Sequence, residues 1–415
     1  MALVNKVREQ GGMMIPVFEP VIGEDEIRAV VAALRRGELS GLFGDSLARF
    51  EREFASYCGC KHGVAVNSGT SALHLAVAAA GIGPGDEVLV SASTNIATAL
   101  AVVHNGATPV PVDSEETTWN LNLDLIEGLI TERTRAIIPV HLFGHPVEMD
   151  RLMDIARRHQ LVVIEDCAEA HGATCHGRPA GSFGQMGCFS FYANKVITTG
   201  EGGMITTNDE RLAERLRLLR NLAFTEQRFR HEEAGYNFRM TGYQAAMGLA
   251  QFAKIEQIIA EKRRVAHTYN HHLRGIEGLQ LPVEAAWARN IYWMYAVVVK
   301  PSFGMTRDQL MERLRESGID TRTFFYPMNQ QPCLRRLKGF RETACPVADC
   351  LWETGLYLPS TYTLSEETIK TIADAIRRAS GQRSQSEVRA AAPLSPLWLS
   401  SLPEFFSLIF RGDLL

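Results

Sequence analysis

The sequence predicts an α/β protein with a large domain, built on a mostly parallel sheet, and a smaller C-terminal α/β domain. Three observations support this expectation. Apolar β-type runs alternate with helical patterns over residues 63–165, which is typical of a parallel sheet with helices on both faces. A long amphipathic pattern over 238–270 then precedes a second, shorter set of patterns. Finally, a chain of 415 residues can bury a large core.

The first part of the chain is regular enough to be divided into elements. The expected strands are 63–66, 86–91, 108–112, 135–140 and 161–165, with helices at 70–80, 95–104, 122–130 and 148–159. A β-branched run at Met204–Thr207 predicts one more strand, and a helix is expected over Asp209–Asn221. The segment that includes Gly23–Gly37 is expected to wrap back on the body of the protein or on a partner.

The second part begins with the helix expected over 238–270, which we interpret as the link between the domains. The small domain is expected to contain the segments Tyr292–Val299, Thr306–Ser317, Asp320–Thr323 and Ser365–Ala379. We therefore place the large domain, with its N-terminal segment, at 1–250, the small domain at 251–380, and a linker with a tail at 381–415.

Lys195 stands out because no charged residue lies near it before Glu201. A short β-type run, CFSF, leads to this lysine, and Thr and Gly residues follow it. A lysine amine in apolar surroundings has a lowered pKa, and the neutral amine can form a Schiff base with an aldehyde. A lysine at a strand end can also be purely structural, so the lysine alone leaves both readings open.

Two further segments supply what a pyridoxal-phosphate enzyme needs besides its lysine. In NSGTSALHLA a β-run enters a helix, and the first N–H groups of that helix, with the hydroxyls of Thr70 and Ser71, can bind a phosphate. In LVVIEDCAEAHG a buried strand ends in acids, and Asp166 is expected to pair with the pyridine nitrogen. Each segment alone is also an ordinary helix start. Their order along the chain, with Lys195 last, favours a cofactor site.

At this point the chain resembles the DegT/DnrJ/EryC1/StrS sugar aminotransferase family, which uses pyridoxal 5'-phosphate to aminate keto-sugar nucleotides. The matching segments are NSGTSALHLA, GDEVLVSASTNIATA, VIEDCAEAHGA, FSFYANKVITTGEGGMITTND and GYNFRMTGYQAAMGLAQ. The resemblance extends over about residues 14–379. It implies the aspartate-aminotransferase-like architecture called fold type I.

The resemblance also implies roles for individual residues. Lys195 binds the cofactor covalently and moves the proton, and Glu169 lies near the phenolic oxygen of the ring. Gly69, Thr70 and Ser190 hold the phosphate. Asn237 reaches the phosphate in the neighbouring subunit, which predicts a homodimer with composite active sites.

Two positions depart from the family. Asn95 stands where relatives place an aromatic side chain on the exposed face of the ring. Ring stacking is worth about 0.5–1.5 kcal/mol beyond area burial. We expect Asn95 either to loosen cofactor binding or to act as a specificity residue, and we favour the second role. Asn329, where relatives often carry His, similarly bears on the identity of the sugar.

Three classes of function follow from the resemblance. The first is an aminotransferase that takes its amino group from glutamate and transfers it to a keto-sugar nucleotide. The second is a dehydratase of the same fold, but such relatives replace the lysine with His, so Lys195 argues against it. The third is a non-enzymatic regulatory relative, which the retained cofactor residues disfavour.

Composition excludes several partners. The net charge of −4 provides no basic field for nucleic acid, and no apolar run reaches the roughly 20 residues of a membrane span. The polar start MALVNKVREQ is unlike a signal peptide, and eight scattered Cys suggest reduced thiols, so we expect a cytoplasmic protein.

Two Cys/His groups lack the spacing of a zinc site, so no metal is expected. They are Cys58, Cys60 and His62, and Cys167, His171, Cys175 and His176. At the C-terminus, Gly381–Pro396 is a polar linker, and Leu397–Leu415 is apolar and has no counterpart in the family. We expect this tail to be a poorly ordered appendage. Docking on the body, a partner or a membrane surface is the alternative.

Overall fold

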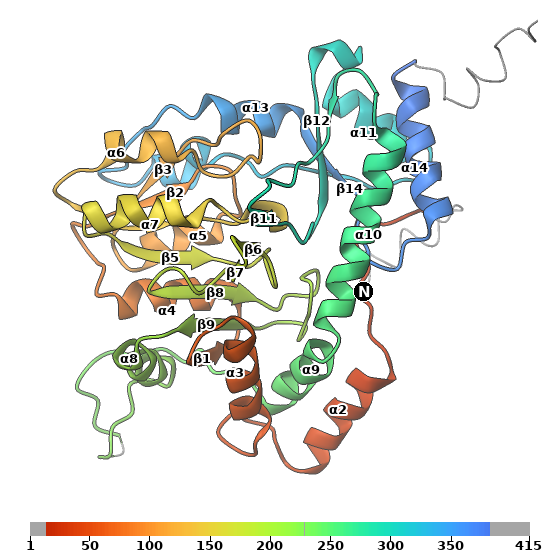
Figure 1. The fold of residues 1–415 in the computed structure, drawn as a ribbon. Coiled ribbons are helices and arrows are strands. Elements are labelled where there is room, and N and C mark those ends of the chain that lie inside the picture. The colour runs from red at the N-terminus through yellow and green to blue at the C-terminus, as the bar shows by residue number, and fades with distance from the viewer. Residues whose placement is uncertain (1–13, 228, 382–415) are drawn as a thin grey trace, which may run out of the picture.

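A computed structural model describes residues 14–227 and 229–381 of the chain. The large part with a mostly parallel sheet and the smaller C-terminal α/β part, both predicted from the sequence, are present. In Figure 1 the seven-stranded sheet lies on the left, and the helices α10, α11 and α14 of the C-terminal part lie on the right. The expected linker and tail at 381–415 lie outside the described residues, apart from Gly381.

The large sheet has the strand order β1-β9-β8-β5-β4-β2-β3. All neighbours from β8 to β3 are parallel, and only β9 runs antiparallel to the strands on its two sides. The strands are β1 (His62–Val66), β2 (Glu87–Ser91), β3 (Thr108–Val112), β4 (Thr134–Ile138), β5 (Val162–Asp166), β8 (Met186–Ser190) and β9 (Gly203–Thr207). The carboxyl ends of the parallel strands therefore meet at one edge, where α/β sheets bind ligands.

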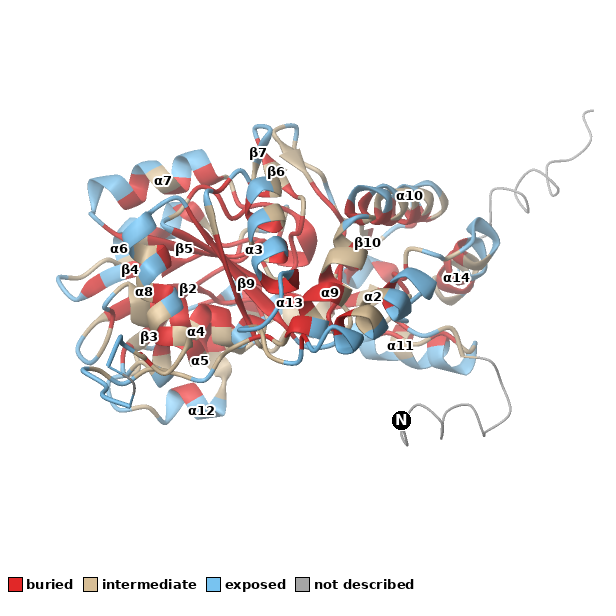
Figure 2. Cartoon of the chain, turned by 90° about the horizontal axis from the view of Figure 1, so that it is seen from below, coloured by how far each residue is buried: buried red, intermediate tan, exposed pale blue. Residues whose placement is uncertain are grey.

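Helices cover both faces of this sheet, as the alternating pattern predicts. One face packs against the apolar sides of α4 (Gly69–Ala79), α5 (Ala97–His104) and α8 (Glu210–Arg220). The other packs against α3 (Ser46–Tyr57), α6 (Ile126–Leu129) and α7 (Met149–Arg158). Figure 2 shows the strands buried and the outward sides of these helices exposed. The strands β2 and β8 are buried at every residue, and apart from Glu87 they consist of apolar or small residues, as burial on both faces of a sheet requires.

The smaller sheet has the order β10-β12-β14-β13, and every neighbouring pair in it is antiparallel. Its strands are β10 (Leu279–Gln280), β12 (Tyr295–Val299), β13 (Arg322–Thr323) and β14 (Gly355–Leu358). The helices α10 (Ile255–Leu273), α11 (Arg307–Glu316) and α14 (Glu366–Ala379) share one apolar core with it. The short helices α12 (Pro332–Arg335) and α13 (Pro346–Thr354) lie between β13 and β14 in the sequence.

Several short elements lie outside these two sheets. The strands β6 (Thr174–Cys175), β7 (Arg178–Pro179) and β11 (Ala288–Arg289) form a third, three-stranded sheet. Single-turn 3-10 helices lie at Leu123–Leu125, Leu142–Gly144, Pro301–Phe303 and Met328–Gln330. Among the described residues, no helix is both long and apolar enough to cross a membrane.

The N-terminal segment wraps back on the body, as expected. The amide of Ile15 donates to the carbonyl of Gly318 at 2.7 Å, so the segment joins the C-terminal part. Helix α2 (Glu24–Arg35) packs against α9 (Gly242–Phe252). The segment thus touches both parts of the molecule, although our domain boundaries assign it to the large domain alone.

The single helix expected over 238–270 is wrong. The chain forms α9 and α10, with a break at Ala253 and Lys254, and residues 238–241 are not helical. Thr241 caps α9 and shares a capping box with Gln244, a Thr-x-x-Gln signal that was legible in the sequence. The proposed domain boundary at residue 250 falls within the last turn of α9, close to this break.

Other expected elements are shorter in the structure. The strand expected from Tyr292 begins at Tyr295, because Tyr292 adopts a left-handed φ of 48°. The helix expected over 122–130 is a 3-10 turn followed by the single turn α6. The helix expected from residue 95 begins at Ala97.

Candidate active site

A cavity of about 310 Å³ opens at the carboxyl edge of the large sheet. The segments after β1, β2, β5 and β8 bring polar side chains to it, and three aromatic side chains of the C-terminal part also line it. The lining residues are Ser68, Gly69, Thr70, Leu73, Thr94, Asn95, Ala97, Val140, Asp166, Ala168, Glu169, Ser190, Tyr192, Asn194, Lys195, Glu201, Trp293, Phe325 and Tyr357. Seven of the nine predicted site residues, all except Ser71 and Asn237, are therefore neighbours.

The predicted phosphate cradle is the N-terminus of α4. Ser68 is the capping residue and accepts a hydrogen bond from the amide of Ser71 at 3.0 Å. A Cβ atom on Gly69 would lie only 2.6 Å from the Cβ of Ser190, so glycine lets the end of β8 approach the helix start. The first amides of a helix have no acceptor within it, and here they border the cavity.

Ser71 faces away from this cavity. Its hydroxyl lies 2.9 Å from the hydroxyl of Ser68, and it does not line the cavity. Its role in cofactor binding stays a prediction, and the side chain contributes to the helix cap in the structure.

Asp166 ends β5 and is 4% exposed. The hydroxyl of Thr98 donates to its Oδ2 at 2.7 Å, and the amide of Ala168 donates to its Oδ1 at 3.1 Å. Burial raises the pKa of Asp166, and these two hydrogen bonds oppose the rise. The carboxyl group is thus held in one orientation at the floor of the cavity.

Glu169 lies three residues beyond Asp166, in the turn after β5, and is 2% exposed. The amide of Phe143 donates to its Oε2 at 2.8 Å. Burial raises the pKa of Glu169 to about 7, although the nearby charge of Lys195 lowers it. A carboxyl group with this pKa can donate or accept a proton near neutral pH.

Lys195 follows β8 and is half-buried in the cavity wall. Burial lowers the pKa of its amine, and the charges of Glu169 and Asp166 raise it in part. The Nζ atom lies 4.0 Å from the centre of the Trp293 ring. The contact with Trp293 is the kind of apolar surrounding that the sequence predicts, but two acids also act on the amine.

Asn95 lies at the cavity mouth and is exposed. Its Oδ1 accepts a hydrogen bond from the amide of Ala97 at 3.0 Å, at the start of α5. Because Thr98 of the same helix holds Asp166, Asn95 shapes the segment that orients this carboxyl group. Sequence reasoning missed this link.

Asn237 is exposed and does not line the cavity of its own chain. It pairs with Asn221, and the next residue, Phe238, accepts from the amide of Asn67 beside the cradle. Its predicted role in the partner's site stays a prediction.

The Cys/His groups noted in the sequence do not assemble as groups. Among residues 14–227 and 229–381, candidate metal ligands come together only as His141 with Glu165 and Cys167, and as Asp150 with Cys175 and His176. His171 instead packs among Phe54, Phe189 and Phe191, and burial lowers its pKa to about 3.

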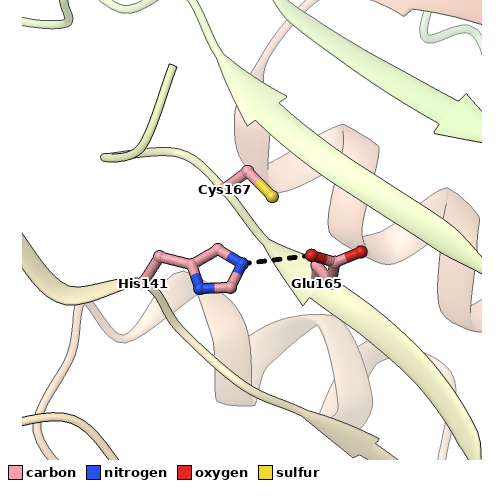
Figure 3. A group of neighbouring side chains, drawn as sticks. All are labelled: His141, Glu165 and Cys167. Atoms are coloured by element: carbon pink, nitrogen blue, oxygen red, sulfur yellow. Dashed lines mark hydrogen bonds and ion pairs between the residues drawn. The ribbon is translucent and has the colours of Figure 1, made fainter. Parts of the chain in front are cut away.

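In the first of these groups, hydrogen bonds within the protein occupy the side chains of His141 and Glu165. His141 accepts from the amide of Val147 through Nδ1, so its other nitrogen, Nε2, donates to Glu165 at 3.2 Å (Figure 3). Three amides also donate to Glu165, those of Gly181, Phe183 and Gly184. Four donors satisfy the carboxylate without a metal ion.

Comparison with known proteins supports the resemblance. Residues 20–377 match the profile of the DegT/DnrJ/EryC1/StrS aminotransferase family. The chain is 44% identical over 335 residues to a GDP-perosamine synthase of Caulobacter vibrioides, which covers 80% of this chain and 90% of that protein. It is 39% identical to a dTDP-3-amino-3,4,6-trideoxy-alpha-D-glucose transaminase of Streptomyces venezuelae, over 88% of this chain and 95% of that protein.

The fold agrees as well. The crystal structure of DesV from S. venezuelae superposes with a TM-score of 0.81 at 38% identity, over 86% of this chain and 95% of that one. The chain belongs to the DegT/DnrJ/EryC1/StrS aminotransferase family. It is a sugar-nucleotide aminotransferase with the fold of PLP-dependent aminotransferases.

Membership of this family implies pyridoxal phosphate as the cofactor, and the residues that line the cavity fit that group. The tight approach of Gly69 to Ser190 leaves the helix amides facing the cavity, as a phosphate requires. The buried Asp166 and the half-buried Lys195 lie in the same wall. Both acids and the lysine were predicted from the sequence.

The sugar aminotransferase cavity has one wall that the sequence prediction did not assign. Trp293, Phe325 and Tyr357 come from three separate segments of the C-terminal part. Two of these segments, NIYWMYAVVV and FFYPMNQQP, carry family likeness, which was the available signal. Their convergence on the cavity needs the tertiary fold.

Proposed function

We propose that this aminotransferase transfers the amino group of glutamate to GDP-4-keto-6-deoxymannose and so forms GDP-perosamine for a surface polysaccharide or glycoside. The likeness to the Caulobacter vibrioides enzyme, over most of both chains, is the observation that supports this sugar. The segments TTGEGGMITTND, NIYWMYAVVV and FFYPMNQQP resemble perosamine synthases in particular.

Six residues that line the cavity would hold the cofactor. Gly69, Thr70 and Ser190 would hold its phosphate, Asp166 its ring nitrogen, and Glu169 would lie near its phenolic oxygen. Lys195 would bind it covalently. When bound, pyridoxal phosphate supplies an aldehyde for amine exchange and a ring that withdraws electrons.

The residues of this chain would then move the proton. A lysine whose amine pKa is lowered by burial has a neutral fraction that can accept a proton at Nζ. The carboxyl group of Asp166, oriented by Thr98, stabilises a positive charge on a ring nitrogen. The aromatic wall excludes water from the far side of the cavity.

The test is a panel of keto-sugar nucleotides, with glutamate as the donor and product detection by mass spectrometry. Amination of the GDP-linked 4-keto sugar, and weak or absent amination of UDP- and dTDP-linked sugars, is the expected result. Preferential amination of a 3-keto sugar, another carrier or a keto-octulosonate would overturn the choice of sugar. Loss of a hydroxyl from the sugar, without amination, would indicate the dehydratase instead.

The regulatory alternative is separated by a simpler measurement. A protein that has lost the chemistry should neither bind pyridoxal phosphate nor form 2-oxoglutarate from glutamate. We expect the purified protein to absorb in the near-ultraviolet and visible bands of the bound cofactor, and to lose that absorbance on borohydride treatment less readily once glutamate has been added.

We further propose that the protein works as a homodimer with composite active sites. Asn237 is exposed and lies outside the cavity of its own chain, as a residue serving a partner must. An apolar surface is also available. It consists of Ile27, Val31 and Leu34 on one side of α2 and Leu39, Leu42 and Phe43 beyond it, each between 39% and 65% exposed. Contiguous apolar surface of this kind marks interaction sites.

A further inference from the structure

Trp293 is 3% exposed, yet its ring borders the cavity and contacts Lys195. Its Nε1 donates to the carbonyl of Asn194 at 2.7 Å. The indole thus contacts two consecutive residues: the backbone of Asn194 and the amine of Lys195. A tryptophan that only filled the core would need an N–H partner, but that partner would not have to be the residue before the lysine.

The backbone around Trp293 is unusually constrained. Tyr292, which precedes it, has a φ of 48°, and Phe143, whose ring stacks with the indole at 6.4 Å, has a φ of 52°. A Cβ on Gly144 would lie 2.9 Å from the amide nitrogen of Trp293. Left-handed backbone at non-glycine residues costs free energy and persists where the surroundings enforce it. Here these positions adjoin a single residue, Trp293, through its backbone and its ring.

A second lysine, which is buried, binds the backbone of Trp293. Lys262 of α10 is 2% exposed, and its Nζ donates at 2.7 Å to the carbonyls of Trp293 and Ser360. The amide of Tyr292 also donates to the side chain of Asn290 at 2.8 Å. The main chain of the loop is therefore fixed to the C-terminal part while the indole reaches the cavity.

We propose that Trp293 is the positioning residue for Lys195, with its ring face holding the ε-amino group and its N–H holding the preceding backbone carbonyl. The proposal rests on the role proposed for Lys195 and extends it to a residue from the other part of the molecule. An aromatic face stabilises an ammonium group relative to the neutral amine, and it limits where that amine can lie. Trp293 thereby sets both the protonation and the direction of the lysine that carries the proton.

The decisive experiment measures the amine directly, so it does not depend on catalysis. The full-length protein without cofactor, which leaves the amine of Lys195 free, is treated with a small acylating reagent over a range of pH. The extent of reaction at Lys195 is quantified by peptide mass spectrometry. Wild type is compared with Trp293→Phe, which keeps an aromatic face but lacks the N–H, and with Trp293→Leu, which lacks both.

In the Leu variant the neutral fraction of the amine should rise at each pH below its midpoint, and acylation should be roughly 2- to 30-fold faster. The Phe variant should remain close to wild type in this profile. With cofactor and glutamate present, kcat should fall in both variants, and more in the Leu variant, while KM for glutamate changes little. Trp287→Leu is the matched control, because Trp287 packs against His145 and His176 away from the cavity.

Identical acylation profiles for wild type, Phe and Leu proteins would overturn the proposal, even if activity fell. If Trp293→Leu does not fold, Trp293→Met against Trp293→Tyr makes the same comparison with larger side chains. An inactive Lys195→Ala enzyme together with unchanged acylation in the Trp293 variants would leave the lysine's role intact and reject the role of Trp293. Active Lys195→Ala enzyme would instead reject the proposed catalytic role itself.

Discussion

Three ionisable side chains meet at the cavity floor, and their surroundings give them different properties. Burial lowers the pKa of Lys195 and raises the pKa values of Asp166 and Glu169. Asp166 has two hydrogen-bond donors among its neighbours, whereas Glu169 has one backbone amide. Environments that push pKa values apart are how one site obtains both an acid and a base.

At Lys195 we expect substitution by Ala to abolish steady-state transamination, because the proton transfer loses its base. The variant should still bind pyridoxal phosphate noncovalently, through the α4 cradle and Asp166. Turnover and cofactor retention after gel filtration provide the measurements. Lys61→Ala, at an exposed lysine, is the control that should behave as wild type. Near-normal turnover of Lys195→Ala would reject the assignment.

The Glu169 carboxyl should make stability depend on pH. Its pKa is about 7 in the fold and near 4.3 in an unfolded chain, so the fold holds the proton more tightly between these values. Wild type should therefore lose stability as the pH rises from about 4.3 to 7, by a few kcal/mol at most. The Glu169→Gln variant has no ionisable group at this position, so its stability should not show this fall with rising pH.

Urea unfolding of cofactor-free protein at about pH 5 and about pH 8 measures the effect. The gain of the Gln variant over wild type should be larger at the higher pH, because there wild type must bury an ionised carboxylate. Glu116→Gln, at an exposed site, should show no such difference. A gain independent of pH would mean that Glu169 is ionised in the fold across the whole range.

Asn95 tests the departure from the family. Asn95→Tyr adds a ring at the cavity mouth but removes the hydrogen bond to Ala97, whose loss at a helix start costs about 0.5–2 kcal/mol. If stacking is what Asn95 lacks, pyridoxal phosphate should bind roughly 2- to 10-fold tighter.

We expect the other outcome: equal or weaker cofactor binding with lower activity on the natural sugar. Titration of cofactor-free protein with pyridoxal phosphate, followed by absorbance, decides between them. Asn95→Ala removes the acceptor for Ala97 without adding a ring, and so separates the loss of this hydrogen bond from the effect of the ring. Clear tightening in the Tyr variant would contradict the specificity role.

At the scale of elements, the turn Leu142–Gly144 connects the two sides of the cavity. The amide of Phe143 donates a hydrogen bond to Glu169, which follows β5 of the large sheet. The ring of Phe143 stacks on Trp293 of the C-terminal part. Gly144 has a φ of 98° and touches Ile291 and Trp293. Its conformation is thus required by neighbours distant in sequence.

Gly144→Ala should therefore destabilise the protein by about 1–3 kcal/mol, because the added Cβ meets Ile291 Cδ1 at 2.8 Å and the left-handed φ is strained. Gly128→Ala is the matched control. It lies in α6 with no atom within 4 Å of the new Cβ, and should be neutral or stabilising by up to about 1 kcal/mol. Urea unfolding compares the two, and equal stabilities would contradict the crowding at Gly144.

At the scale of the whole molecule, two features point outward from the single chain. The exposed apolar surface on α2 and the following residues lacks a cover among the described residues, and Asn237 is exposed near the cradle. In a symmetric dimer the apolar surface would be buried against its copy, because a two-fold interface presents the same patch twice. Asn237 would then contribute to the cofactor site of the partner subunit.

Mixing two defective variants tests the composite site. Lys195→Ala and Asn237→Ala homodimers should each be impaired, the second through weaker cofactor binding. Heterodimers from co-expression contain one intact site if Asn237 serves the partner, so activity should recover to about a quarter of wild type. If Asn237 serves its own chain, both sites of the heterodimer are defective and activity does not recover. A fully active monomer in light scattering would reject the dimer altogether.

The sequence by itself determined the alternation of strands and helices over residues 63–165, but not the helices α2 and α3 before it, and it predicted that Lys195, Asp166 and Glu169 belong to one site. These depend on local signals, because periodicity defines a strand and the residues that follow a parallel strand lie at its ligand-binding edge. The start of α9 at Gly242 was missed although the Thr241 capping box was present. The division between α9 and α10 was missed because both helices share one continuous amphipathic pattern.

Only the tertiary structure decided how Trp293, Phe325 and Tyr357 form the opposite wall, and how Thr98 comes to hold Asp166. These contacts join segments far apart in the chain, and no local pattern specifies which of many buried aromatic or hydroxyl side chains will meet. The raised pKa of Glu169 belongs here too, because it depends on burial of the carboxyl group in the folded chain. The residue types carried the chemistry, and packing placed them close enough to perform it.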